Sequence, residues 1–277
     1  MRINPDIFKA YDIRGKFPKD LNENAALRIG NAVAEHLSRR LRKRRLDILI
    51  CRDLRLSSNS LKDALGRGIM AQGSQVIDAD RGTTPYFYFL MHRVKADGGI
   101  MVTASHNPRD YNGFKILGRG GLHIFDGIGL EKIKKIALAG KVPKNSAVQT
   151  ISYSNLENQY IRFLQQSVRI GKIRAVIDAG GGSATLFLPQ VLSHFENFVY
   201  KPLFFEPDGS FEKHSPNPLL PEAQSFVKKE LARGGFQFGA VLDGDGDRVV
   251  CFDEKGGMVE PELIFLLLAR EELNKTT

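Results

Sequence analysis

Short apolar runs alternate with segments of helical periodicity along the first part of the chain. Within 22–41, Ala26, Ile29, Val33 and Leu37 recur at the spacing of one buried helix face. A short strand at 8–15, strands at 46–51, 75–78 and 99–102, and a second helix at 61–72 complete the series. This alternation predicts an α/β layer, and open sheets of that kind tend to bind ligands where their strands end.

A polar stretch at 140–150 follows a predicted helix at 127–139 and indicates a linker between two domains. Beyond it the pattern predicts helices at 155–166 and 261–270, and strands at 173–178, 238–242 and 249–252. The glycine-rich segment 179–184 lacks the third glycine of a dinucleotide fingerprint and the Gly-Lys-Ser/Thr of a P-loop. We therefore interpret it as a structural turn from strand to helix.

The length and composition are typical of a globular protein with two domains. The 277 residues are 42% hydrophobic and 26% charged. No apolar run approaches the roughly 18 residues of a membrane span, and residues 1–6 lack the apolar core of a signal peptide. Cys51 and Cys251 are too few for a disulfide framework or a zinc site. We expect a cytoplasmic protein with no membrane partner.

The net charge of +9 admits two interpretations. The basic run 39–45 favours binding to a polyanion, but no nucleic-acid-binding module accompanies it. The alternative is a solvated helix end together with a cleft that is positive for phosphorylated substrates. We expect no nucleic-acid partner.

A loop with candidate chemistry follows the apolar run 99–102. The strand stops at Thr103 and Ala104, which raises the hydroxyl of Ser105 to the rim of the sheet, next to His106. Pro108 and Gly113 are expected to keep this loop from continuing as strand or helix. A bare Ser-His pair is more often an ordinary polar loop, so the pair alone does not establish a nucleophile.

A second candidate loop lies between the strands 238–242 and 249–252. Asp243, Asp245 and Asp247 alternate with glycines, and three carboxylates this close repel one another unless a cation or solvent screens them. Oxygen ligands of this kind suit Mg2+, and the glycines let the loop curl around one centre. An EF-hand is excluded because Arg248 occupies the position of its glycine and strands flank the loop.

The two loops together resemble the α-D-phosphohexomutases, the family of phosphomannomutases and phosphoglucomutases. Residues 103–115 are similar to that family's phosphoserine loop and 243–248 to its metal-binding loop, in the family's order; 11–15, 52–58 and 82–85 resemble further segments. The resemblance implies an α/β fold of two successive mixed-sheet, three-layer domains. They would span 1–145, with the phosphoserine loop, and 151–255, with the metal loop; 256–277 would begin a third, truncated domain.

The resemblance also implies roles for single residues. Ser105, His106 and Lys115 would be catalytic, Tyr11, Arg14 and Arg248 would bind substrate or phosphate, and Ser105, Asp243, Asp245 and Asp247 would hold Mg2+. From the residues alone, Lys115 could be a surface lysine, a proton carrier or an electrostatic contact. The implied reaction is that of an isomerase: phosphate moves between the C1 and C6 hydroxyls of a mannose or glucose phosphate by way of phosphoserine and a bisphosphate.

Two later motifs of the family are absent from this sequence, a Glu-x-Ser-Gly sugar-reading loop and an Arg-x-Ser-Gly-Thr phosphate loop. Three interpretations stay open: a piece of a longer mutase, a half-enzyme completed by another chain, or a non-catalytic phosphosugar-binding or regulatory remnant. The helix at 261–270 is apolar nearly all round, so we expect self-association through 262–268.

Overall fold

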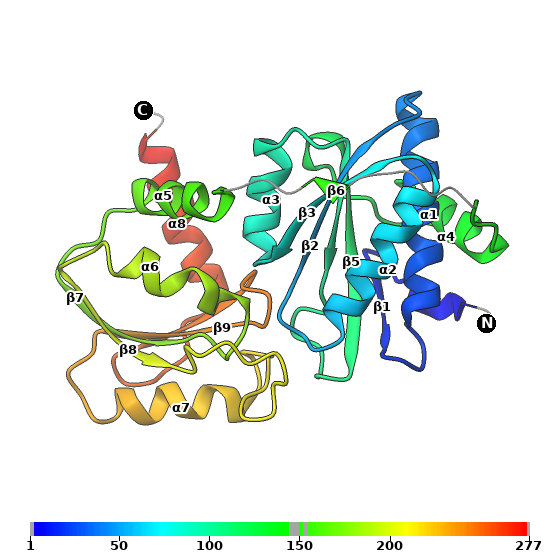
Figure 1. The fold of residues 1–277 in the computed structure, drawn as a ribbon. Coiled ribbons are helices and arrows are strands. Elements are labelled where there is room, and N and C mark those ends of the chain that lie inside the picture. Colours follow the sequence, from blue (N-terminus) through cyan, green and yellow to red (C-terminus); the bar gives the residue numbers. More distant parts are fainter. Residues whose placement is uncertain (1–2, 144–149, 152–154, 276–277) are drawn as a thin grey trace.

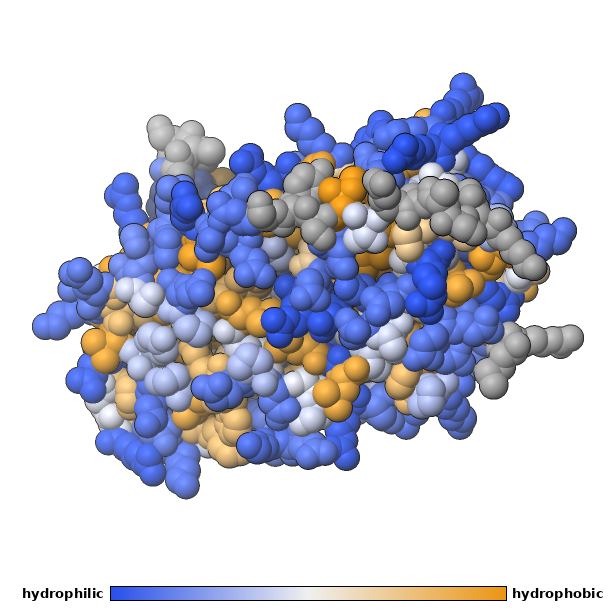
Figure 2. Space-filling model, viewed as in Figure 1, coloured by the Kyte–Doolittle hydropathy of each residue, from blue (hydrophilic) through white to orange (hydrophobic). Residues whose placement is uncertain are grey.

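The computed structural model describes residues 3–143, 150–151 and 155–275, which form two α/β domains side by side (Figure 1). In each domain a mixed sheet lies between helices, which confirms the predicted fold class. Hydrophilic residues cover most of the face shown in Figure 2, and hydrophobic residues reach it in smaller areas. No helix among the described residues combines the length and the apolarity needed to cross a bilayer.

The first sheet has the strand order β1–β5–β4–β2–β3–β6. Its strands are β1 (Ile13–Lys16), β2 (Asp47–Arg52), β3 (Gln75–Arg81), β4 (Gly98–Val102), β5 (Tyr111–Gly118) and β6 (Thr150–Ile151). Strand β5 is antiparallel to both β1 and β4, and the other pairs are parallel. Part of the predicted linker, 144–149, lies outside the described residues, and β6 after it extends the first sheet beside β3.

Helices cover both faces of this sheet. The helices are α1 (Glu23–Leu41), α2 (Ser58–Ala71), α3 (Thr84–Arg93) and α4 (Leu130–Ala139), with short 3-10 turns η1 (Pro5–Ile7) and η2 (Arg119–Gly121). In β2, Ile48 and Ile50 pack into the core with α1, α2 and α4, whereas Leu49 and Cys51 pack into the core with α3. Successive strand residues point to opposite faces, so one apolar strand supplies both cores.

Local signals explain the limits of α1. The side chain of Asn22 accepts a hydrogen bond from the N–H of Ala25, which caps the first turn. At the other end Arg42 has a left-handed backbone (φ 51°) that stops the helix. The predicted apolar face is present, since Ile29 and Val33 are fully buried. The helix therefore begins one residue after the predicted position, at its cap.

The second sheet has the order β10–β9–β7–β8, with β10 antiparallel and the others parallel. Its strands are β7 (Ile173–Asp178), β8 (Phe198–Leu203), β9 (Phe238–Leu242) and β10 (Val249–Asp253). The helices are α5 (Leu156–Ser167), α6 (Leu188–Leu192), α7 (Pro221–Leu231) and α8 (Pro261–Lys275), with the 3-10 turn η3 (Ser183–Leu186). Helices α6 and α7 lie on opposite faces of this sheet (Figure 1). The glycine segment between β7 and η3 is a turn, as predicted.

An apolar core joins the two domains. The ring of Tyr86 in α3 lies 5.2 Å from that of Tyr160 in α5 and 5.0 Å from that of Phe187, centroid to centroid. All three rings belong to the core cluster that includes Leu49 of the first sheet. Buried aromatic contacts of this kind hold the first domain against the second, and they determine which loops meet at the junction.

The expectation that Gly113 keeps the loop after Ser105 from continuing as a strand was wrong. Gly113 lies inside β5, paired with Arg14 of β1. A Cβ built there would lie 2.2 Å from the carbonyl oxygen of Ile13, so glycine is required by close packing of two backbones. The serine loop is therefore a tight connection between two adjacent central strands.

Candidate functional site

The Ser105 hydroxyl lies at the junction of the two domains. Ser105 follows β4 with a left-handed backbone (φ 51°), and its N–H donates to Oγ1 of Thr103 at 2.8 Å. A left-handed backbone is uncommon for a serine and occurs where surrounding contacts impose it. Oγ donates to Oδ2 of Asp243 at 2.7 Å and accepts from Nη2 of Arg248 at 2.8 Å. The loop 103–110 of the first domain (the serine loop) and the loop 243–248 of the second domain (the aspartate loop) therefore form one site.

Arg55 binds the backbone of the serine loop through hydrogen bonds. Its guanidinium is almost wholly buried and donates hydrogen bonds to four backbone carbonyls, those of Ser105 (2.8 Å), Asn107 (2.7 Å), Pro108 (2.8 Å) and Tyr111 (3.1 Å). Residues 52–58 resemble a segment of the phosphohexomutases, but no pattern in the sequence predicts this role of Arg55. A planar group with five donors is suited to gathering several carbonyls at once.

Asp53 supports Arg55. Oδ2 of its buried carboxylate lies 3.2 Å from Nε of Arg55, and Oδ1 accepts hydrogen bonds from the Arg55 N–H and from the Ser58 hydroxyl. Burial raises the pKa of Asp53, and the charge of Arg55 opposes that rise. The pair is a positioning element for the loop that carries Ser105.

The aspartate loop curls, but the expectation that all three carboxylates face one centre is not met among the described residues. Oδ1 of Asp243 accepts the backbone N–H groups of Asp247 (2.9 Å) and Arg248 (3.0 Å), and Gly246 has φ 67°. This turn leaves Oδ2 of Asp243 to face Ser105 and the Arg248 guanidinium. Burial, and after it the charge of Asp245, raise the pKa of Asp243.

Lys115 lies between the other two carboxylates. Its Nζ is 2.9 Å from Oδ2 of Asp245 and 2.7 Å from Oδ2 of Asp247. Burial would lower the pKa of this ammonium, but the two carboxylates outweigh that effect and raise it. Burial likewise opposes ionisation of Asp245, yet the neighbouring Lys115 lowers the pKa of that carboxyl. Lys115 is therefore a charged residue of the site.

The oxygen donors of the aspartate loop fit a divalent cation. Oδ1 of Asp245 is buried and has no hydrogen-bond partner, and Thr84 and Thr103 direct hydroxyls at Oδ2 of the same carboxylate. Within the described residues no three metal-binding side chains are arranged around one centre. Instead, Lys115 pairs with Oδ2 of Asp245, and Arg248 pairs with Oδ2 of Asp243. A metal bound at Asp243, Asp245 and Asp247 would replace these cationic contacts with its own charge.

His106 and Arg14 also reach the site. Arg248 contacts Nδ1 of His106, and burial together with the charges of Arg248 and Arg14 lowers the pKa of His106 to about 4. Arg14 donates to the Asn107 side chain at 2.5 Å and pairs with Asp12 at 2.7 Å. A cavity of about 580 Å³ opens beside His106 on the second-domain side. Tyr11 is 76% exposed, and its ring packs 6.1 Å from that of Phe125, centroid to centroid.

A buried pair that the sequence analysis missed supports the second half of the site. Nε2 of His214 lies 3.2 Å from Oδ2 of Asp178 at the end of β7, and Nδ1 lies 2.7 Å from the carbonyl oxygen of Ser215. The next carbonyl, that of Pro216, accepts the N–H of Gly244 in the aspartate loop. No sequence motif links these residues.

The His214–Asp178 pair predicts a pH-dependent stability. Burial lowers the pKa of His214, but Asp178 and the Ser215 carbonyl outweigh it, so the pKa is raised. The pair therefore stabilises the fold fully below the ordinary histidine pKa of about 6.5 and loses that contribution as pH rises through the raised value. Urea unfolding of the wild type and Asp178→Asn should differ more at about pH 6 than at about pH 9. A difference that is the same at both pH values would contradict the pairing.

Comparison with known proteins identifies the family. Residues 5–142 match the family model described as phosphoglucomutase/phosphomannomutase, alpha/beta/alpha domain I, and residues 155–257 match domain II of the same family. These matches cover both α/β domains and both loops of the site. The chain belongs to the phosphoglucomutase/phosphomannomutase family.

Individual relatives agree with that assignment. A phosphomannomutase of Salmonella montevideo is 36% identical over 98% of this chain, and phosphohexose mutases of Xanthomonas campestris are 37% identical over 97%. A solved structure of a phosphoglucomutase/phosphomannomutase family protein from Burkholderia thailandensis aligns with a TM-score of 0.88 at 30% identity and covers 99% of this chain. The chain spans about 60% of the length of each of these proteins.

Proposed function

We propose that this chain supplies the phosphoryl-donor site of a phosphohexomutase. The proposal rests on the hydrogen bonds of the Ser105 hydroxyl with Asp243 and Arg248. Ser105 lies on a loop of the first domain, whereas Asp243 and Arg248 lie on a loop of the second. The names of the relatives, phosphomannomutase and phosphohexose mutases, support a phosphorylated hexose as the substrate, a mannose or glucose phosphate. The proposed class is an isomerase of carbohydrate metabolism, acting in the cytoplasm.

The proposed reaction transfers a phosphoryl group from Ser105 to the free hydroxyl of a hexose monophosphate. The P–O bond to Oγ breaks as a new P–O bond to the sugar oxygen forms, and the proton of the sugar hydroxyl ends on Oγ of Ser105. The resulting bisphosphate turns over and returns its other phosphoryl group to Ser105, so no phosphate is lost to water. Ser105 is in turn the donor and the nucleophile.

Arg248, His106 and Lys115 have separable tasks in this proposal. Nη2 of Arg248 lies 2.8 Å from Oγ of Ser105, where a guanidinium would bind a phosphoryl oxygen, and His106 positions Arg248 through its ring nitrogen. Nζ of Lys115 lies beside the carboxylates of Asp245 and Asp247, and its positive charge would stabilise negative charge that develops at the sugar hydroxyl. Arg14, and Tyr11 at the exposed edge, would bind the substrate.

Mg2+ is the proposed cofactor, held by Asp243, Asp245, Asp247 and an oxygen on Ser105. A phosphoryl dianion on Oγ would be only a few ångströms from the Asp243 carboxylate, and like charges that close repel strongly when buried. Bound Mg2+ supplies the positive charge that offsets this repulsion and polarises the phosphorus.

Intact-mass spectrometry tests the proposal. After incubation with glucose 1,6-bisphosphate and Mg2+, the chain should gain one phosphoryl group, and Ser105→Ala should gain none. No gain in a folded wild-type chain would contradict the donor function of this chain. That outcome would favour the second candidate, a non-catalytic phosphosugar-binding or regulatory protein; the intact serine, lysine and aspartate cluster argues against it.

Self-association through α8 is a further part of the proposal. Leucine and phenylalanine side chains project from this helix into solvent, namely Leu263, Phe265, Leu266, Leu267, Leu268 and Leu273. Exposed apolar area of this extent favours burial against another surface. Light scattering after size exclusion should show dimers or larger species for the wild type and a smaller mass for Phe265→Glu/Leu268→Glu. The exposed Leu219 on another surface is the control, and Leu219→Glu should leave the mass unchanged; a monomeric wild type would contradict the proposal.

A further inference from the structure

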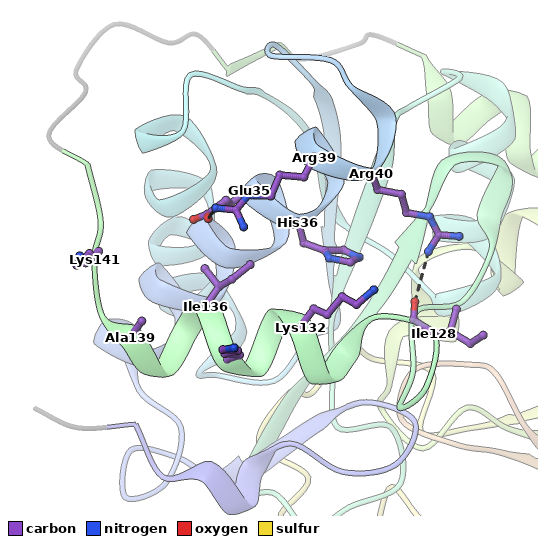
Figure 3. A pocket seen from close by; sticks show the side chains of 10 residues that line it. Glu35, His36, Arg39, Arg40, Ile128, Lys132, Ile136, Ala139 and Lys141 are labelled. Carbon is purple, nitrogen blue, oxygen red and sulfur yellow. Dashed lines mark hydrogen bonds and ion pairs between the residues drawn. The ribbon is translucent and has the colours of Figure 1, made fainter.

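A groove with a volume of about 700 Å³ lies between α1 and α4 (Figure 3). It is on the side of the first domain away from the second domain, as Figure 1 shows. Ser105 follows the carboxyl end of β4, whereas α1 ends just before the amino end of the parallel strand β2. The groove and the Ser105 site therefore lie near opposite ends of the parallel strands.

Positive charge gathers in this groove. Both helices and the segment after α4 contribute cationic side chains to its lining, namely Arg39, Arg40, Lys132, Lys135 and Lys141. Glu35 is the one carboxylate among the described lining residues, and it pairs with Arg39 at 2.5 Å. The lining therefore carries four uncompensated positive charges, out of a net +9 for the whole chain. An excess of one charge on the walls of a groove favours binding of an ion of the opposite charge.

His36 forms part of the groove and lacks a partner. The side chain projects from α1 into the space between the helices, where Lys132 also projects from α4 (Figure 3). His36 is only 8% exposed, and its Nε2 is buried against Gly129, on the loop before α4, with no hydrogen-bond partner. A buried polar nitrogen without a partner is costly, and it occurs where a ligand or water completes the site. Burial and the charges of Arg40 and Lys132 lower its pKa.

The groove also has apolar walls. Ile128, Ile136 and Ala139 line it beside the cationic side chains. Nη1 of Arg40 donates to the carbonyl oxygen of Ile128 at 3.3 Å, which holds the guanidinium at the groove. Arginine and lysine side chains together bind phosphate oxygens well, and an apolar wall accommodates an organic group.

We propose that the groove between α1 and α4 binds a small phosphorylated anion, with Lys132, Lys135 and Arg40 as its phosphate ligands and His36 beneath them. The limited volume of the groove and its apolar wall favour a small molecule over a nucleic-acid strand, which binds along an extended basic surface. The site is separate from Ser105 and does not depend on the proposed reaction.

Calorimetric titration with inorganic pyrophosphate and with adenosine diphosphate, both without Mg2+, tests the proposal. Lys132→Gln/Lys135→Gln should weaken binding of both by about tenfold or more, since each hydrogen bond to a charged group contributes about 1.5–3 kcal/mol. Lys134→Gln is the matched control on the same helix, because Lys134 lies over the ring of Phe8, 5.8 Å from its centroid, and does not line the groove. It should bind like the wild type.

Histidine NMR separates the groove from the Ser105 site. The chain has six histidines, and pyrophosphate should shift the resonances of His36 in both the wild type and Ser105→Ala. Tighter binding of the diphosphate than of pyrophosphate would show that the apolar wall contacts an organic group, and equal binding would identify the phosphates as the ligand. Equal weakening by Lys134→Gln, shifts at His106 without any at His36, or binding of an RNA strand but not of pyrophosphate would overturn the proposal.

Discussion

Asp245→Asn should abolish phosphoryl transfer to and from Ser105. The carboxylate is fully buried and ionised beside Lys115, with hydroxyls of Thr84 (2.6 Å) and Thr103 (3.3 Å) directed at it. An amide keeps the shape but removes the charge that would hold Mg2+ and Lys115. Loss of about 4 kcal/mol of transition-state stabilisation corresponds to a rate about a thousandfold lower.

The rate of phosphoryl gain from glucose 1,6-bisphosphate, followed by intact mass, checks this result. Asp253→Asn is the control, since that carboxylate lies at the end of β10, where it accepts the backbone N–H groups of Lys255 and Gly257. It should react like the wild type. Removal of Mg2+ with a chelator should reduce the wild-type rate in the same way, and added Mg2+ should restore it. A folded Asp245→Asn protein with the full rate would refute the metal site.

Arg55→Met should both destabilise the first domain and disable Ser105. The substitution leaves four carbonyl groups of the serine loop without their donor and leaves the buried Asp53 carboxylate without its counter-charge. Removal of one partner from a buried ion pair costs about 3–5 kcal/mol. We expect the free energy of unfolding in urea to fall by about that amount, and phosphoryl gain at Ser105 to fall with it.

Arg109→Met is the matched control for Arg55→Met. Arg109 lies on the loop that carries Ser105, between β4 and β5, but its ion pair with Glu212 at 2.8 Å is exposed on both sides. Pairs of that kind contribute about 0–1 kcal/mol. Arg55→Lys should be intermediate, because an ammonium with three donors cannot reach all four carbonyls. Equal stability of Arg55→Met and Arg109→Met would show that the serine loop holds its shape without Arg55.

Local patterns in the sequence were sufficient to predict the helices and strands named below and the candidate chemistry of each loop. The helix at 22–41 and the strand at 46–51 follow from apolar periodicity, and both are present within a residue of the predicted limits. The curl of the aspartate loop follows from its glycines and from its own backbone N–H groups, which the Asp243 carboxylate accepts. Such features depend on residues close together in the chain, so the sequence displays them directly.

The tertiary structure decided which of these pieces meet. Ser105 and Asp243 are 138 residues apart, and they are brought together by the aromatic core between the domains. The role of Arg55 was not predictable because its partners are backbone carbonyls, which every residue has. The same is true of Gly113, whose requirement for glycine comes from a neighbouring strand. The sequence by itself thus determined the family and the candidate residues, whereas contacts between distant segments, which leave no periodic signal, decided the geometry of the site.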